Sequence, residues 1–155
     1  MPKITPEKVA TAQKRWGLGV IEIGETYQSG GDYAARARRH LDELYGYHVD
    51  TVAFKPTLAS DIPFRATLEG ALSYFVAGNS DYPEDHGFAL KPWVAVRFDQ
   101  ETLIIQNESA QSMGHYYFTD TVGSETKVEF SFGYFLGPNG ALLINLHHSS
   151  LPYGS

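Results

Sequence analysis

The spacing of hydrophobic residues changes near Gly87, and this change constrains the fold more than any other feature of the chain. In the first third of the chain, apolar residues recur every three or four positions, which is typical of amphipathic helices. After Gly87, alternating patterns predict strands at 88–98, 102–107, 111–119, 126–136 and 141–151. Helices followed by a run of strands indicate an α+β fold. We therefore predict a strongly curved antiparallel sheet wrapped around a long N-terminal helix.

Helix signals are clear in the first part of the chain. Thr5 is a suitable N-cap, and Pro6 suits the first position of the long helix. A Ser-Gly-Gly sequence ends this helix, and Asp32 caps a second one that closes at Gly46. A strand and a short helical segment are expected to follow at 48–54 and 64–76.

Length and composition limit the class of protein. The 155 residues are expected to form one domain, 1–155, and an aromatic content of 14% suggests a large cavity or interface. The absence of cysteine excludes disulfides, cysteine-bound zinc and a thiol nucleophile. A net charge of −6 disfavours nucleic acid as a partner. No apolar run approaches the roughly 18 residues that span a bilayer, so we expect no membrane partner and a cytoplasmic location.

The last predicted strand carries the most informative side chains. Strand alternation puts five residues on one face: Leu142, Ile144, Leu146, His148 and Ser150. Three aliphatic residues followed by two polar ones are typical of a strand that runs from a core into the mouth of a pocket. We therefore expect His148 and Ser150 to line a pocket.

Metal-binding patterns are weak in this chain. The six histidines show no chelating spacing: His40, His48, His86, His115, His147 and His148. The last two are adjacent in a strand and point to opposite faces, so they cannot share one metal ion. The pair Asp85-His86, in a polar loop, is the remaining metal candidate.

Several motifs together resemble the iota-class carbonic anhydrases, a family similar to the association domain of calcium/calmodulin-dependent kinase II. The most specific is His-His-Ser-Ser-x-Pro-Tyr at the end of the chain. The matching segments are 54–59, 64–65, 70–75, 84–89 and 147–153. The resemblance implies a nuclear-transport-factor-like cone fold, which agrees with the α+β prediction.

The resemblance also implies the reversible hydration of CO2 to bicarbonate, without a metal cofactor, in a pocket inside the cone. The threonine, tyrosine and serine of the family's active site fall on Thr57, Tyr74 and Ser150. His148 lies beside them and is our candidate proton acceptor or shuttle. Expected substrate-binding residues are the cations Lys55 and Arg65 and the apolar Phe75, Trp93 and Leu146. Either Tyr74 or its neighbour Phe75 is expected to line the pocket, and a homodimer formed through the sheet is expected.

Three alternatives remain at this point. The first is a non-catalytic association module that uses the same fold to oligomerise. The second is another small-molecule enzyme of the same cone, although the expected pocket positions contain few carboxylates. The third is a hydratase that depends on manganese or zinc.

Overall fold

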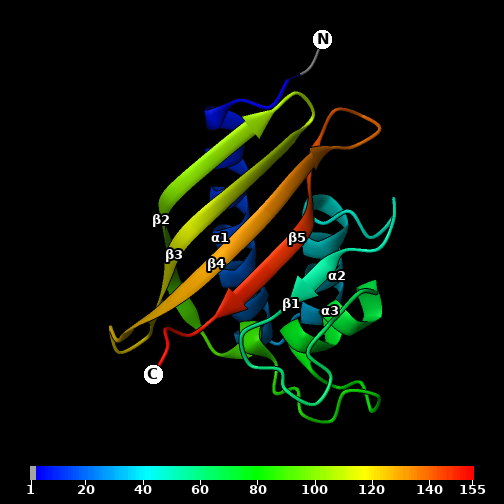
Figure 1. The fold of residues 1–155 in the computed structure, drawn as a ribbon. Helices are drawn as coiled ribbons and strands as arrows, with labels where there is room; N and C mark the ends of the chain where they lie inside the picture. Colours follow the sequence, from blue (N-terminus) through cyan, green and yellow to red (C-terminus); the bar gives the residue numbers. More distant parts are fainter. Residues whose placement is uncertain (1–2) are drawn as a thin grey trace.

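The computed structural model describes residues 3–155, with helices first and a sheet afterwards (Figure 1). The helices are α1 (Pro6–Gln28), α2 (Tyr33–Leu44), α3 (Leu68–Val76) and a short 3-10 helix, η1 (Phe88–Leu90). The strands are β1 (Ala53–Lys55), β2 (Trp93–Gln106), β3 (Ser109–Asp120), β4 (Glu125–Leu136) and β5 (Leu142–Ser150). The predicted α+β order is confirmed. No helix within residues 3–155 is long and apolar enough to cross a membrane.

The helix starts follow their capping residues. The Thr5 side chain accepts a hydrogen bond of 3.2 Å from the amide of Lys8, and Pro6 is the first residue of α1. The Asp32 carboxylate accepts one of 3.0 Å from Ala35 at the start of α2. Each cap satisfies one of the amide groups that a helix leaves unpaired in its first turn. The predicted beginnings of both helices are therefore confirmed.

The five strands form one open sheet in the order β1-β5-β4-β3-β2. Strands β2 to β5 are an antiparallel meander, as predicted, but β1 pairs with β5 in parallel. The sheet is therefore mixed, and the purely antiparallel prediction is wrong at this edge. The chain reaches the sheet from α2 and enters the edge beside β5 in the same direction, which the strand pattern alone does not reveal.

Strand β2 continues through the break that the sequence suggested at Asp99-Gln100-Glu101. The pairing moves from Gln100 opposite Gly114 to Thr102 opposite Met113, so Glu101 is the extra residue of a β-bulge. A side chain at position 114 would collide with the backbone of Asp99 and Glu101. Glycine therefore permits the bulge, and one long strand replaces two short ones.

The helices cover one face of the sheet, and α1 runs behind it along its length (Figure 1). Trp16 of α1 is 2% exposed and lies at the centre of this layer. Its ring contacts aromatic rings from four strands, with centroid distances of 5.4 to 6.0 Å: Phe98, Tyr116, Phe118, Phe132 and His147. Burial of each such ring stabilises the fold by about 2 kcal/mol. The core is therefore an aromatic layer between α1 and the sheet.

Candidate active site

Strand β5 also contains a β-bulge. Gly133 of β4 pairs with Leu146, whereas the next residue, Tyr134, pairs with Ile144. Asn145 therefore has no pairing partner on β4 and is the extra residue of the bulge. A side chain at position 133 would lie 2.9 Å from Cβ of Leu146, so glycine gives the bulge its space. After an extra residue, the alternation of faces continues in the opposite phase.

The bulge changes which residues of β5 face the helices. His147 and Ser149 are each 2% exposed and lie on the inner face. His148 is exposed, Ser150 and Leu146 are half-buried, and all three belong to the outer face. These three residues therefore do not line the inner cavity, and His148 and Ser150 line a separate cavity of about 540 Å³ on the outer face instead. The physical reason is the single extra residue, which reverses the phase of the strand after Ile144.

Three hydroxyl groups meet on the inner face, at the junction of β1 and β5. The Ser149 hydroxyl lies 2.5 Å from the Thr57 hydroxyl and 2.5 Å from the Tyr116 hydroxyl. The Tyr116 hydroxyl also lies 3.0 Å from Nε2 of His147. Thr57 reaches this point because β1 runs parallel to β5, with Lys55 opposite His148. Thr57 therefore contacts Ser149, whereas the sequence predicted that its neighbour Ser150 would lie in the site.

Hydrogen bonds extend this group into the aromatic core. Nδ1 of His147 lies 2.8 Å from the Tyr45 hydroxyl, which accepts a hydrogen bond of 2.9 Å from the indole of Trp16. Burial holds the pKa of His147 well below its ordinary value, so this imidazole is neutral. Burial also raises the pKa of Tyr45 and of Tyr116 well above 10, so both keep their protons.

Tyr74 of α3 lies on the other side of Thr57. Its hydroxyl accepts a hydrogen bond of 3.3 Å from the amide of Leu58 and lies near the Thr57 hydroxyl. Burial raises the pKa of Tyr74 to about 12, so this phenol is protonated at neutral pH. Phe75 is also buried, and both residues line the inner cavity. The sequence left open whether Tyr74 or Phe75 lines the pocket, and in the structure both residues line the inner cavity.

Two cavities meet at this group. The inner one, of about 10 Å³, has room for one water-sized molecule, and the outer one measures about 580 Å³. Both are lined by Thr57, Tyr74 and Phe88. Trp93 lines the outer cavity. Lys55 lines neither cavity and donates a hydrogen bond of 3.4 Å to the carbonyl of Ser149. The outer cavity is mainly apolar, which suits CO2.

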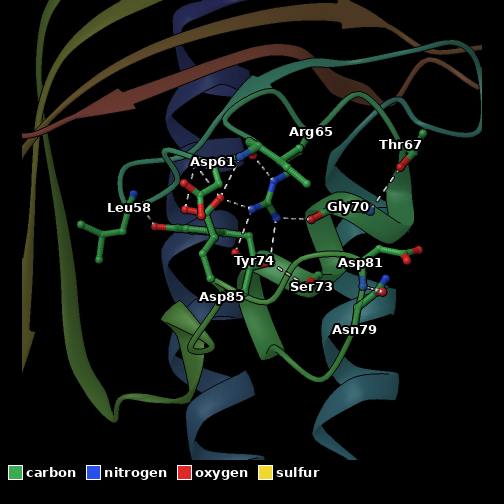
Figure 2. A network of polar contacts seen from close by, with 12 residues as sticks. Leu58, Asp61, Arg65, Thr67, Gly70, Ser73, Tyr74, Asn79, Asp81 and Asp85 are labelled. Carbon is green, nitrogen blue, oxygen red and sulfur yellow. Dashed lines mark hydrogen bonds and ion pairs between the residues drawn. The ribbon is translucent and has the colours of Figure 1, made fainter.

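Arg65 holds a buried ion pair rather than a site for an anion (Figure 2). Its guanidinium is fully buried and makes two hydrogen bonds of 2.8 Å to the Asp85 carboxylate. It also donates to the carbonyls of Ile62 at 2.8 Å and Gly70 at 2.9 Å. The Ser73 hydroxyl donates to Asp85 at 2.6 Å. The prediction that Arg65 contacts bicarbonate is therefore wrong, because protein groups already occupy its donors and its charge is balanced.

The Glu84 carboxylate fixes the neighbouring loop. It accepts hydrogen bonds of 2.8 to 3.2 Å from the amides of three consecutive residues, Ser60, Asp61 and Ile62. These amides, that of Ser60 first, lower the pKa of Glu84 to about 2. The same loop carries Leu58, whose amide meets the Tyr74 hydroxyl (Figure 2). Glu84 therefore fixes the loop that contacts Tyr74, and the Arg65–Asp85 pair fixes α3 at Gly70 and Ser73. The sequence indicated neither support.

The metal candidate of the sequence is not supported. Both Asp85 oxygens accept hydrogen bonds from Arg65, and His86 is exposed beside them. Residues 3–155 contain no group of three or more histidine, aspartate or glutamate side chains placed to hold a metal ion.

Solved structures place the fold in a known class. A putative calcium/calmodulin-dependent protein kinase II association domain from Xanthomonas campestris matches with a TM-score of 0.67 and 22% identity, over 100% of this chain and 97% of that one. A nuclear transport factor 2-like protein from Salmonella enterica matches with a TM-score of 0.51 and 11% identity, over 95% of each chain. The predicted nuclear-transport-factor-like fold is confirmed.

Closer relatives identify the family. A family model described as metal-independent carbonic anhydrase matches residues 7–151. A metal-independent carbonic anhydrase from Nostoc sp. is 41% identical over 153 residues, which cover 97% of this chain and 75% of the relative. The crystal structure of a cyanobacterial iota-carbonic anhydrase complexed with bicarbonate matches with a TM-score of 0.96 and 39% identity, over 99% of this chain and 96% of that one.

The chain belongs to the metal-independent carbonic anhydrase family. It is a carbonic anhydrase that hydrates CO2 to bicarbonate reversibly, and it uses no metal cofactor. The expected function is confirmed. The association module, the metal-dependent hydratase and a different enzyme of the same cone are set aside by this membership.

Proposed function

We propose that CO2 is hydrated where the inner and outer cavities meet, at the hydroxyl groups of Thr57, Tyr74 and Ser149. The observation that carries this placement is the convergence of three hydroxyl groups at the end of an apolar cavity. The crystallised relative with bound bicarbonate supports a small oxyanion as the ligand of such a fold.

Binding of CO2 needs few polar contacts. CO2 is apolar, and it enters through the outer cavity along Trp93, Phe118 and Val128. The inner cavity holds one molecule of water size, so it positions the attacking water beside the carbon atom. Exclusion of bulk water strengthens each electrostatic contact in the site.

The hydration step places negative charge on oxygen. The water oxygen forms a bond to carbon, one C=O electron pair moves onto a CO2 oxygen, and the water loses a proton. Hydroxyl protons of Thr57 and Tyr74 then stabilise the developing carboxylate oxygens, as the donors of an oxyanion hole do. Bicarbonate leaves through the outer cavity because Arg65, already paired with Asp85, does not retain it.

The released proton needs an acceptor in the outer cavity. Burial keeps His147 neutral, and both of its ring nitrogens already have tyrosine partners. His148 lies on the outer face of the sheet. His86 is exposed and lines the outer cavity. The proton therefore passes to water in that cavity and on to His86 or buffer.

Stopped-flow CO2 hydration by metal-free protein tests this placement. Thr57→Val and Tyr74→Phe each remove one hydroxyl with little change in shape. Each is expected to lower kcat by about a hundredfold, the effect of losing one oxyanion donor. Thr51→Val, at an exposed threonine, is the matched control. Full activity of both site variants would contradict the placement. A thermal melt of each variant distinguishes a loss of activity caused by the missing hydroxyl group from one caused by unfolding.

We also propose a homodimer that forms through the sheet face left uncovered by the helices. Met113, 58% exposed, and Ile104, 47% exposed, offer apolar surface on strands β3 and β2. His147 does not contribute to this face, because the bulge turns its side chain inward. Light scattering after size-exclusion chromatography tests the dimer. The cytoplasm is the compartment that we propose, and cell fractionation tests it.

A further inference from the structure

We propose that Trp16 sets the direction of a buried hydrogen-bond chain that ends at the active site. The chain, called here the Trp16–Thr57 chain, consists of Trp16, Tyr45, His147, Tyr116, Ser149 and Thr57. Its members come from α1, the end of α2, β5, β3 and the segment after β1. The inference rests on the placement of the reaction proposed above.

The first link has only one possible direction. An indole nitrogen donates and cannot accept, so Trp16 donates to the Tyr45 hydroxyl at 2.9 Å. Tyr45 is fully buried and keeps its single proton. The remaining polar atom beside that hydroxyl is Nδ1 of His147, at 2.8 Å. Tyr45 therefore donates its proton to Nδ1.

The imidazole of His147 continues the same direction of hydrogen-bond donation. Neutral histidine has one N–H donor and one acceptor nitrogen. Since Nδ1 of His147 accepts from Tyr45, its proton is on Nε2, which donates to the Tyr116 hydroxyl at 3.0 Å. The opposite tautomer leaves the Tyr45 proton without an acceptor in a buried place, which is costly.

Each following hydroxyl receives one proton and donates its own. Tyr116 accepts from His147 and donates to Ser149, and Ser149 donates to Thr57. Thr57 is then free to donate its proton to the ligand or to the Tyr74 hydroxyl. In both cases the last free proton points into the cavity. Successive hydrogen bonds in one direction polarise each other, which strengthens the final donor.

This direction has a consequence for catalysis. The Trp16–Thr57 chain stabilises negative charge on a CO2 oxygen, and it does not carry the released proton away. Proton transfer through the chain would reverse every link, and Trp16 cannot accept the first one. Trp16, Tyr45 and His147 are therefore positioning residues that act through Ser149 and Thr57.

Nitrogen NMR of His147 in the unmodified protein is the first test. With ¹⁵N-histidine labelling, we expect an unprotonated Nδ1 and a protonated Nε2, unchanged through the neutral pH range. The signal is assigned by its loss in His147→Gln. An Nδ1–H tautomer or a charged ring would overturn the inference, whatever the activity, because this readout does not depend on turnover.

Trp16→Phe tests the origin of the direction. The ring is retained but the N–H donor is removed, so both His147 tautomers become accessible. We expect a mixed tautomer signal and a kcat for CO2 hydration about tenfold lower, with KM changed by less than about twofold. Tyr45→Phe is a second variant, with the same expected fall in kcat.

The control is Tyr134→Phe, at a buried tyrosine on the inner face of β4 outside the Trp16–Thr57 chain. It is expected to leave the His147 tautomer unchanged. Unchanged tautomers and unchanged kcat in Trp16→Phe would overturn the role of Trp16. A mixed tautomer with full kcat would show that the direction has no catalytic effect. Suppose that Thr57→Val loses activity while Trp16→Phe keeps the His147 tautomer unchanged. This result would overturn the role of Trp16 but would still support the proposed site.

Discussion

The hydroxyl groups of Thr57 and Ser149 lie 2.5 Å apart, although 92 positions separate them in the chain. The contact is possible because β1 and β5 run parallel at the edge of the sheet. It joins the segment that follows β1 to the inner face of β5. The neighbouring Ser150 points to the outer face, so the two serines provide a matched pair for experiment.

Ser149→Ala is expected to lower kcat for CO2 hydration by about a hundredfold, because it interrupts the hydroxyl chain beside the substrate. Ser150→Ala is expected to change kcat by less than about twofold. Stopped-flow measurements on both metal-free variants make the comparison. A larger loss in Ser150→Ala than in Ser149→Ala would show that the reaction occurs elsewhere.

Breaking the Arg65–Asp85 pair is expected to destabilise the protein strongly. Arg65→Met leaves the buried Asp85 carboxylate without its partner, at a cost of about 3–5 kcal/mol in the free energy of unfolding. Arg38→Ala is the control, because Arg38 is 47% exposed and its ion pair with Glu69 contributes about 0–1 kcal/mol. Urea unfolding measures both. If the two variants lose equal stability, the structural role assigned to Arg65 is incorrect.

Stability is expected to fall as the solution becomes acidic, because of His40. Burial, followed by the charges of Arg36 and Arg15, lowers its pKa from 6.5 in the unfolded chain to about 3 in the fold. Below pH 6.5, His40 therefore binds a proton in the unfolded chain, whereas in the folded protein it stays neutral down to about pH 3. The stability associated with neutral His40 is fully present above pH 6.5 and is lost as the pH falls from 6.5 to about 3. At pH 5 the loss from this histidine is about 2 kcal/mol.

Urea unfolding at several pH values checks this slope. His40→Leu removes the contribution of His40 and is expected to flatten the dependence on pH, although it changes the stability at neutral pH as well. The control is His48→Leu, at an exposed histidine, which is expected to keep the slope. Parallel curves for His40→Leu and the unmodified protein would refute the assignment. Burial of His147 acts in the same direction and accounts for a remaining slope.

Removal of metal ions is expected to leave the activity unchanged. The family is metal-independent, and the site that we propose would supply hydroxyl donors in place of a Lewis acid. The measurement is stopped-flow hydration after treatment with a chelator, with the metal content determined by mass spectrometry. Activity that disappears and returns with added manganese or zinc would assign the chemistry to a metal ion instead.

The sequence by itself determined the layered plan of this protein. The capping residues Thr5 and Asp32 define where the helices begin, because caps act through local hydrogen bonds. The alternating pattern after Gly87 identified the strands, since burial of one sheet face repeats every two residues. The motifs that include Thr57 and Tyr74 identified the family, and both residues belong to the site that we propose.

Only the tertiary structure decided which residues of the last strand enter the site. One extra residue, Asn145, reverses the alternation, so His147 and Ser149 face inward in place of their neighbours. Gly133, opposite the bulge, is the signal that indicates it, because glycine within a strand often marks a bulge. The pairing of Arg65 with Asp85 was equally hidden, since 20 positions separate them. Register and long-range pairing depend on which segments meet in space, and local sequence patterns do not encode that.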